Sequence, residues 1–246
     1  MKQTRWYILL ACSLILLSSV SYLIQIVVFH RTEDTFFYML QDIAFVPIQV
    51  LFVTLIISEL MSRREKLTMI KKMNMVVGVF FSEVGTGLLR LFSAFDGNFE
   101  EIRGNLVIAN DWSEQRFDGS MKFFRTCHYM IDMGKSDLDA IRTFLMEKRA
   151  DMLALMENPN LLEHESFTDL LMSVSHLTDE LDARKDLNRL AKPDRDHIAL
   201  DIKRAYMLLI IEWLSYMKHL KGDYPFLFSF SVRTNPFDPN ASVEIK

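Results

Sequence analysis

The first quarter of the chain is dominated by two long runs of apolar residues. The first extends from Trp6 to Phe29 and has no charged side chain, and the second extends from Phe36 to Ser58 and contains one, Asp42. As a helix, the first run would be about 36 Å long, enough to cross a hydrocarbon layer of about 30 Å. Because backbone polar groups must be satisfied inside lipid, each run is expected to be a transmembrane helix.

A short polar connector, residues 30–35, joins the two runs. It leaves room only for an antiparallel hairpin, which we place within residues 1–60, with helices over about 6–29 and 36–58. A cleaved signal peptide is the alternative for the first run. Its apolar stretch is longer than the usual ~7–15 residues, however, and no small-residue cleavage site follows it, so a retained anchor is the better interpretation.

Positive charge is distributed unevenly around this hairpin. Lys2 and Arg5 precede the first run, whereas the connector holds only Arg31, beside two acidic residues. The excess of basic residues on one side predicts a multi-pass protein of the cell (inner) membrane with both termini in the cytosol. We interpret the basic residues after the second run as topology determinants that also reach anionic lipid head groups. They are Arg63, Arg64, Lys66, Lys71 and Lys72.

Four polar side chains inside the predicted hairpin match one another in depth. Ser18 and Gln25 are seven residues apart and share a helix face, and the same spacing separates Asp42 from Gln49. Folding the hairpin about its connector pairs positions whose numbers add up to about 67, so Gln25 faces Asp42. Ser18 likewise faces Gln49. Polar groups in hydrocarbon bind one another, so we interpret the set as a clamp or an assembly contact. An ion or proton path through Asp42 is the alternative.

Beyond residue 60, apolar positions recur with the 3.6-residue period of amphipathic helices. A capping box of Ser136 and Asp139 opens one helix, and Pro193 occupies a favoured first-turn position of another. Strand signals are nearly absent, and residues 226–232 are the best candidate. The predicted helices cover about residues 60–95, 99–131, 136–158, 162–181 and 193–220.

This pattern predicts an all-α protein. We expect a cytosolic bundle of four or five helices in residues 61–232, followed by an extended, turn-rich tail in residues 233–246. The apolar segment Met73–Leu89 raises the alternative of a third membrane segment. Its uncharged part of about ten residues is too short to span, so we expect a buried core helix instead. Its glycines, Gly78, Gly85 and Gly87, indicate close packing or a break.

Composition and charge narrow the classes of function. The net charge is −4 and no basic block follows Lys72, which argues against nucleic-acid binding. Cys12 lies in the first apolar run and Cys127 in the expected cytosolic part, so no disulfide is expected.

Candidate chemistry is sparse. Several histidines have carboxylates close by, but such pairs at a spacing of four are common on solvated helix faces. A dinuclear metal site in a bundle needs a Glu-x-x-His motif on each of two helices, which this sequence lacks, so no metal or other cofactor is expected. A phosphate-binding loop and a nucleophilic triad are not evident either. The histidine–acid groups are His128–Asp132, His176–Glu180, His197–Asp201, and His164 between Glu163 and Glu165.

These features favour a membrane-anchored interaction or sensory module, in which the bundle binds a partner or ligand. A homo-oligomeric channel or membrane effector gated by the bundle is the alternative, and it requires several copies because two helices cannot enclose a pore. A membrane-bound, metal-dependent enzyme is the second alternative, although no catalytic residue is predicted. The expected partners are the lipid bilayer, further copies of the chain, or another membrane or cytosolic protein.

A reporter fused after Lys246 should be cytosolic. The amino terminus, two basic residues before the hairpin and five after it favour the cytosolic side, against Arg31 alone on the other side. Parallel fusions to a fluorescent protein that matures in the cytosol and to a phosphatase that is active outside it give opposite signals. An external Lys246 would contradict the topology and point to a third span through Val76.

Overall fold

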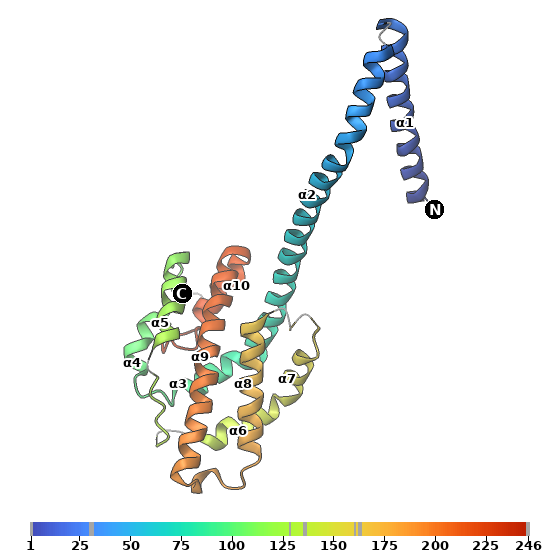
Figure 1. Ribbon diagram of the computed structural model, residues 1–246. Coiled ribbons are helices and arrows are strands. Elements are labelled where there is room, and N and C mark those ends of the chain that lie inside the picture. The colour runs from blue at the N-terminus through green and yellow to red at the C-terminus, as the bar shows by residue number, and fades with distance from the viewer. Residues whose placement is uncertain are drawn as a thin grey trace. The chain divides into compact units, whose positions relative to one another are not determined.

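The computed structural model describes residues 2–29, 32–127, 129–134, 137–159, 161 and 164–244 (Figure 1). Within these ranges the chain forms helices and no β-strand, apart from one isolated antiparallel bridge between Asp96 and Ile131. The predicted all-α class is therefore confirmed. The chain divides into two compact units, Met1–Lys66 and Leu67–Lys246.

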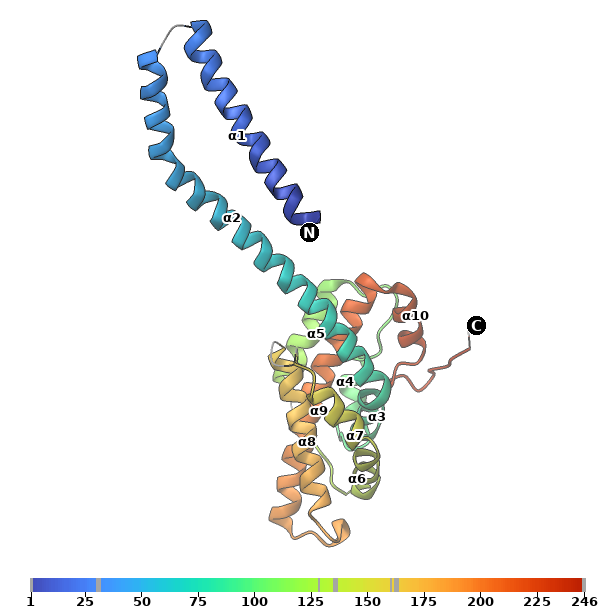
Figure 2. The same cartoon turned by 90° about the vertical axis from the view of Figure 1, so that its right-hand side faces the viewer.

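The first unit contains α1 (Lys2–Phe29) and the beginning of α2 (Thr32–Phe80). The two helices meet at the connector and spread apart along their length (Figure 2). Tyr22 and Gln25 of α1 are half-buried and Thr35 of α2 is buried, whereas the described side chains farther from the connector are exposed. Close contact between the helices is therefore confined to the connector end.

Among the described residues, three helical segments are long and apolar enough to cross a membrane: Trp6–Val28, Thr32–Glu65 and Lys72–Ser93. Burial separates the third from the other two. The apolar windows of the first two are 0% buried, whereas 44% of the third is buried. Its buried side chains, among them Val77, belong to the hydrophobic core of the second unit. The structure thus agrees with the expectation that Met73–Leu89 is a core segment.

Helix α9 (Lys192–Asp223) forms the centre of the second unit, and Pro193 lies in its first turn as predicted. Buried apolar residues occur along its length on several faces. A helix that is apolar on many sides must be surrounded by other elements. The helices that pack against it are α3 (Thr86–Ser93), α5 (Glu114–Thr126), α8 (Glu165–Asp182) and α10 (Pro225–Arg233).

Shorter elements complete the second unit. Helices α6 (Leu138–Glu147) and α7 (Arg149–Met156) pack against α8. Helix α4 (Phe99–Ile102) continues into the 3₁₀ turn η2 (Arg103–Asn105), and another 3₁₀ turn, η4 (Leu187–Arg189), lies between α8 and α9. The helices are therefore shorter and more numerous than the sequence pattern suggested.

The prediction of a single helix over residues 99–131 is wrong. The chain leaves the 3₁₀ turn at Asn105, and α5 begins only at Glu114. Ser113 gives the physical reason, because its Oγ accepts a hydrogen bond from the backbone N–H of Arg116 and so caps a new helix.

The helix predicted over residues 136–158 is also interrupted. Asp137, rather than Ser136, is its N-cap, and the Asp137 Oδ1 accepts a hydrogen bond from the backbone N–H of Ala140 at 3.0 Å. Ser136 itself lies outside the described residues. The pattern then breaks at Lys148, which leaves the helical conformation and separates α6 from α7.

Residues 226–232, the best strand candidate, form helix α10 instead. Pro225 lies in its first turn, where a missing N–H costs nothing because that group has no intrahelical partner. The chain after α10 is fixed by the buried side chain of Asn235. Its Nδ2 donates to the carbonyl of Leu106 at 2.9 Å, and its Oδ1 accepts from the backbone N–H of Phe237 at 2.9 Å.

Candidate functional site

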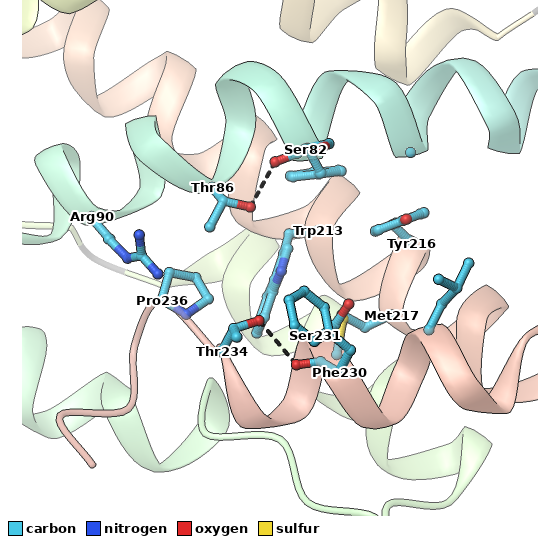
Figure 3. A pocket seen from close by; sticks show the side chains of 13 residues that line it. Ser82, Thr86, Arg90, Trp213, Tyr216, Met217, Phe230, Ser231, Thr234 and Pro236 are labelled. Carbon is cyan, nitrogen blue, oxygen red and sulfur yellow. Dashed lines mark hydrogen bonds between the residues drawn. The ribbon is translucent and has the colours of Figure 1, made fainter. Parts of the chain in front are cut away.

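A cavity of about 400 Å³ opens on the second unit, between α9, α10 and the chain from the end of α2 to α3 (Figure 3). This volume is within the range of about 300–1,000 Å³ that is typical of small-molecule sites. Its walls combine aromatic and aliphatic side chains with hydroxyl groups and one cation. The lining residues are Gly78, Phe81, Ser82, Thr86, Arg90, Trp213, Tyr216, Met217, Leu227, Phe230, Ser231, Thr234 and Pro236.

A π-helical segment, η1 (Phe81–Gly85), forms one wall of this cavity. The carbonyl of Phe81 accepts hydrogen bonds from both the backbone N–H and the Oγ1 of Thr86, the latter at 2.7 Å. Gly85 is required here, because a Cβ at this position would lie 2.5 Å from Cδ1 of Phe81. Single π turns inside α-helices occur frequently at functional sites, so this wall is a candidate binding surface.

Tyr216 covers the same wall from α9. Its ring stacks on Phe81, with centroids 5.3 Å apart and an interplanar angle of 14°. Gly78 leaves room for the phenol, since a Cβ there would lie 3.2 Å from the Tyr216 Oη. Burial raises the pKa of the Tyr216 phenol, so the group stays protonated and can donate a hydrogen bond.

Arg90 supplies the positive charge of the cavity. Its side chain is exposed, lies beside Pro236 at one end of the cavity in Figure 3, and pairs with no carboxylate of the described chain. The hydroxyl groups of Ser82 and Ser231 also have no hydrogen-bond partner within the described ranges, whereas Thr234 donates to a carbonyl of its own helix at 3.0 Å. The cavity therefore presents a free cation and free hydroxyl groups beside apolar walls.

In the hairpin, the structure gives Asp42 a different partner from the one predicted. The phenol of Tyr22 donates to Oδ2 of Asp42 at 3.3 Å, and no hydrogen bond links Gln25 to Asp42 in the described part of the hairpin. Tyr22 precedes Gln25 by three residues, so the same face of α1 is used about one turn farther from the connector. Ser18 and Gln49 are both exposed, and no hydrogen bond joins them among the described residues.

Four polar side chains of α1 gather on one face. Ser18, Ser21, Tyr22 and Gln25 line an open groove of about 380 Å³ together with two leucines. Asp42 of α2 reaches this face through Tyr22. The hairpin therefore has a polar face, and the hydrogen bond observed across it joins Tyr22 to Asp42, about one turn from the predicted Gln25–Asp42 contact.

Three of the five predicted topology determinants have described side chains. Arg63 forms an exposed ion pair with Glu59, with Nε and Oε1 2.6 Å apart. Arg64 and Lys72 are exposed as well. The side chains of Lys66 and Lys71 are outside the described part of the structure, so the role of the cluster stays a prediction.

Two of the histidine–acid pairs noted in the sequence, one on α8 and one on α9, lie next to each other. His164 instead caps the start of α8, where its Nδ1 accepts a hydrogen bond from the backbone N–H of Phe167 at 3.3 Å. His128 and Glu163 lie outside the described residues. The adjoining pairs are His176–Glu180 from α8 and His197–Asp201 from α9.

The sequence matches two family models. One is described as MJ1433, N-terminal helical domain, and covers residues 2–61, and the other as Uncharacterized protein MJ1433, C-terminal helical domain, and covers residues 69–233. This chain belongs to the MJ1433 family. A relative, Uncharacterized protein MJ1433 of Methanocaldococcus jannaschii, is 44% identical over 246 residues, which are 100% of this chain and 98% of the relative. No solved structure matches the sequence.

Sequence reasoning missed the cavity of this MJ1433 family member. Its walls come from separate stretches of chain around residues 78–90, 213–217 and 227–236, and none of them carries a motif. The available signal was the group of glycines in the first stretch. Gly78 and Gly85 are indeed positions where aromatic rings approach the backbone closely.

The register of the hairpin can be tested by substitution and cross-linking. Asp42→Asn should keep the hairpin, because an amide oxygen still accepts from Tyr22, whereas Asp42→Leu should weaken its packing by about 0.6–2 kcal/mol, the scale of one interhelical hydrogen bond. In a chain lacking Cys12 and Cys127, a cysteine pair at positions 22 and 42 should cross-link within one chain more efficiently than a pair at 25 and 42. The opposite order, or cross-links mainly between chains, would contradict this register.

Proposed function

We propose that this chain is a membrane-anchored ligand-binding module. The hairpin of α1 and α2 anchors it in the bilayer, and the cavity beside η1 binds a small amphipathic anion. The observation that carries this proposal is the contrast in burial between the two units. The second unit covers its own apolar side chains, whereas the apolar windows of the hairpin are 0% buried.

Lipid is the environment that such a hairpin requires. Exposing a Leu, Ile or Phe side chain to water rather than burying it costs about 1.5–3 kcal/mol, and the hairpin exposes many of them on all sides. A protein partner would have to surround both helices, while hydrocarbon covers every side at once. Trp6 and Tyr7 at one end and Phe36, Phe37 and Tyr38 at the other support this placement, because aromatic residues favour the interface.

The side chains that line the cavity favour an amphipathic anion as its ligand. The rings and side chains of Trp213, Met217 and Phe230 offer an apolar wall for a hydrocarbon or ring. The unpaired guanidinium of Arg90 suits a carboxylate or phosphate, because charge-assisted and bidentate hydrogen bonds to such groups are strong. A few polar groups beside apolar walls are the usual composition of a small-molecule site.

The anchor can be tested by fractionation. The full chain should stay in the membrane fraction after an alkaline wash, whereas residues 67–246 alone should be soluble and give a strongly helical circular dichroism spectrum, because that unit has its own core. As a matched control, residues 1–66 fused to an unrelated soluble protein should fractionate with the membrane. Release of the full chain by the wash would contradict the anchor.

The ligand class can be tested with dodecanoate as the probe. In the fragment 67–246, where no bilayer takes up the probe, a brominated dodecanoate should quench the part of the tryptophan fluorescence that comes from Trp213 and leave that of the buried Trp112. Arg90→Gln should weaken binding roughly 10–100-fold, the equivalent of about 1.5–3 kcal/mol for a hydrogen bond to a charged group. Gly78→Leu should abolish binding, because it fills the cavity below Tyr216.

Two control variants accompany this measurement. Arg103→Gln removes an arginine that does not line the cavity, and Gly119→Leu enlarges a glycine with open space around it. Neither should change the binding of the probe. Equal quenching in the wild-type chain and in Arg90→Gln would reject the anion, and quenching that survives Gly78→Leu would reject the cavity.

A further inference from the structure

Helices α8 and α9 lie side by side and run antiparallel, joined by residues 183–191 (Figures 1 and 2). Near this connection, charged and imidazole side chains of the two helices face one another in pairs. Each pair is one helical turn from the next, as an antiparallel register requires. The pairs between the helices are His176–Asp201 and Glu180–His197, and Arg184 of the connection pairs with Asp194 of α9.

The first two pairs form a closed ring of four side chains. The Nε2 of His176 lies 3.8 Å from Oε1 of Glu180 and 3.6 Å from Oδ2 of Asp201. The Nε2 of His197 lies 3.7 Å from Oε2 of Glu180 and 3.3 Å from the same Oδ2 of Asp201. Each imidazole therefore lies between two carboxylates, and each carboxylate lies between two imidazoles.

Asp201 is the buried member of the ring, with only 3% of its side chain exposed. Its Oδ1 accepts a hydrogen bond from Arg204 at 3.2 Å. Its Oδ2, which faces both imidazoles, is buried and has no hydrogen-bond partner among the described residues. A buried carboxylate oxygen without a donor is costly, so this atom needs a cation close by.

Glu180 is held in place by Arg184. The Nη1 of Arg184 donates to Oε2 of Glu180 at 2.6 Å, and its Nε donates to Oδ2 of Asp194 at 3.0 Å. Arg184 thus binds the Oε2 atom of Glu180, whereas Oε1 lies on the side of His176. Such a supporting residue orients a metal ligand without binding the ion itself.

We propose that His176, Glu180, His197 and Asp201 bind one divalent transition-metal ion, for which Zn²⁺ fits best. Two imidazoles and two carboxylates are an ordinary zinc donor set. In a tetrahedral zinc site with bonds of about 2.0–2.1 Å, neighbouring ligand atoms lie about 3.3–3.4 Å apart. One ligand atom each from His176, Glu180 and His197 already lie within 4.8 Å of one another, and Oδ2 of Asp201 lies 3.6 and 3.3 Å from the two imidazoles. Binding of an ion requires these side chains to draw together around it, with Asp201 approaching from the buried side.

The ring is accessible from solvent on one side. The side chains of His176 and His197 are 47% and 49% exposed, which leaves an entry path for the ion. An open hollow of about 490 Å³ adjoins His176 and is lined by residues of α8 and α9. Because four protein ligands complete a tetrahedral shell, the ion is structural and ties the two helices together next to their connection.

His219 and Asp223 provide a matched control on the same helix. They have the same spacing as His197 and Asp201, and their Nδ1 and Oδ2 atoms are 2.8 Å apart. Among the described residues, no third ligand from another helix joins them. The pair His197–Asp201 therefore has ligand groups of a second helix beside it, whereas the pair His219–Asp223 has none among the described residues.

The test uses the full chain in detergent, purified without a histidine tag and freed of metal by a chelator. Equilibrium dialysis against Zn²⁺ should give one ion per chain. His176→Gln and His197→Gln should each weaken binding by about 100-fold or more, and Asp201→Asn by at least about tenfold, since even supporting residues of metal sites contribute about 10–100-fold. His219→Gln should leave binding unchanged. Zn²⁺ should also raise the melting temperature of the wild-type chain and not that of His197→Gln.

Co²⁺ provides a second measurement that needs no substitution. The unmodified chain should give the intense visible absorption of tetrahedral Co²⁺, and one equivalent of Zn²⁺ should remove it. The absence of a band that Zn²⁺ displaces would overturn the proposal. Undiminished Zn²⁺ binding by a chain carrying both His176→Gln and His197→Gln, or an equal loss in His219→Gln, would overturn it as well.

Discussion

Helix α9 has to be covered on many sides, and the arrangement of the second unit follows from that requirement. Its buried residues extend from Ile198 to Leu220, so one neighbouring helix cannot cover them. Helices α3 and α5 come from earlier parts of the chain and, together with the sequence neighbours α8 and α10, surround it. The hairpin of the first unit has the opposite property, because the described apolar windows of its helices are 0% buried. The two units thus differ in their apolar side chains, which the second unit buries in its own core and the hairpin exposes.

The all-α class and the hairpin helices could be predicted because both depend on local patterns. Helix boundaries in the second unit depended on single groups that the apolar period does not reveal, such as the Oγ of Ser113 and the break at Lys148. The segment 226–232 has strand-like composition, yet Pro225 and the covering of α9 favour a helix. The Tyr22–Asp42 contact was not predicted because Tyr22 was not counted among the polar residues of the hairpin, although its phenol reaches Asp42.

Both candidate sites lie between helices, and this explains how little of them the sequence revealed. The histidine–acid pairs of α8 and α9 were visible, but each alone is an ordinary surface pair. Their significance depends on the antiparallel register, which brings Oδ2 of Asp201 to two imidazoles at once. The cavity beside η1 depends on a π turn, which has no sequence signature, and on ring packing over Gly78 and Gly85. The glycines indicated close packing, but not which rings pack there.

The pairing of α5 with α9 also determines what a partly synthesised chain looks like. Lys218 contacts Asp118, 100 residues earlier, at 2.8 Å. At about 5–20 residues per second, α5 leaves the ribosome roughly 5–20 s before the helix that covers it. Until α9 leaves the ribosome, the apolar faces of α5 and α3 that pack against it remain uncovered. The nascent chain is therefore most exposed to proteases and to aggregation just before α9 is translated, when only the hairpin and the helices before α9 exist.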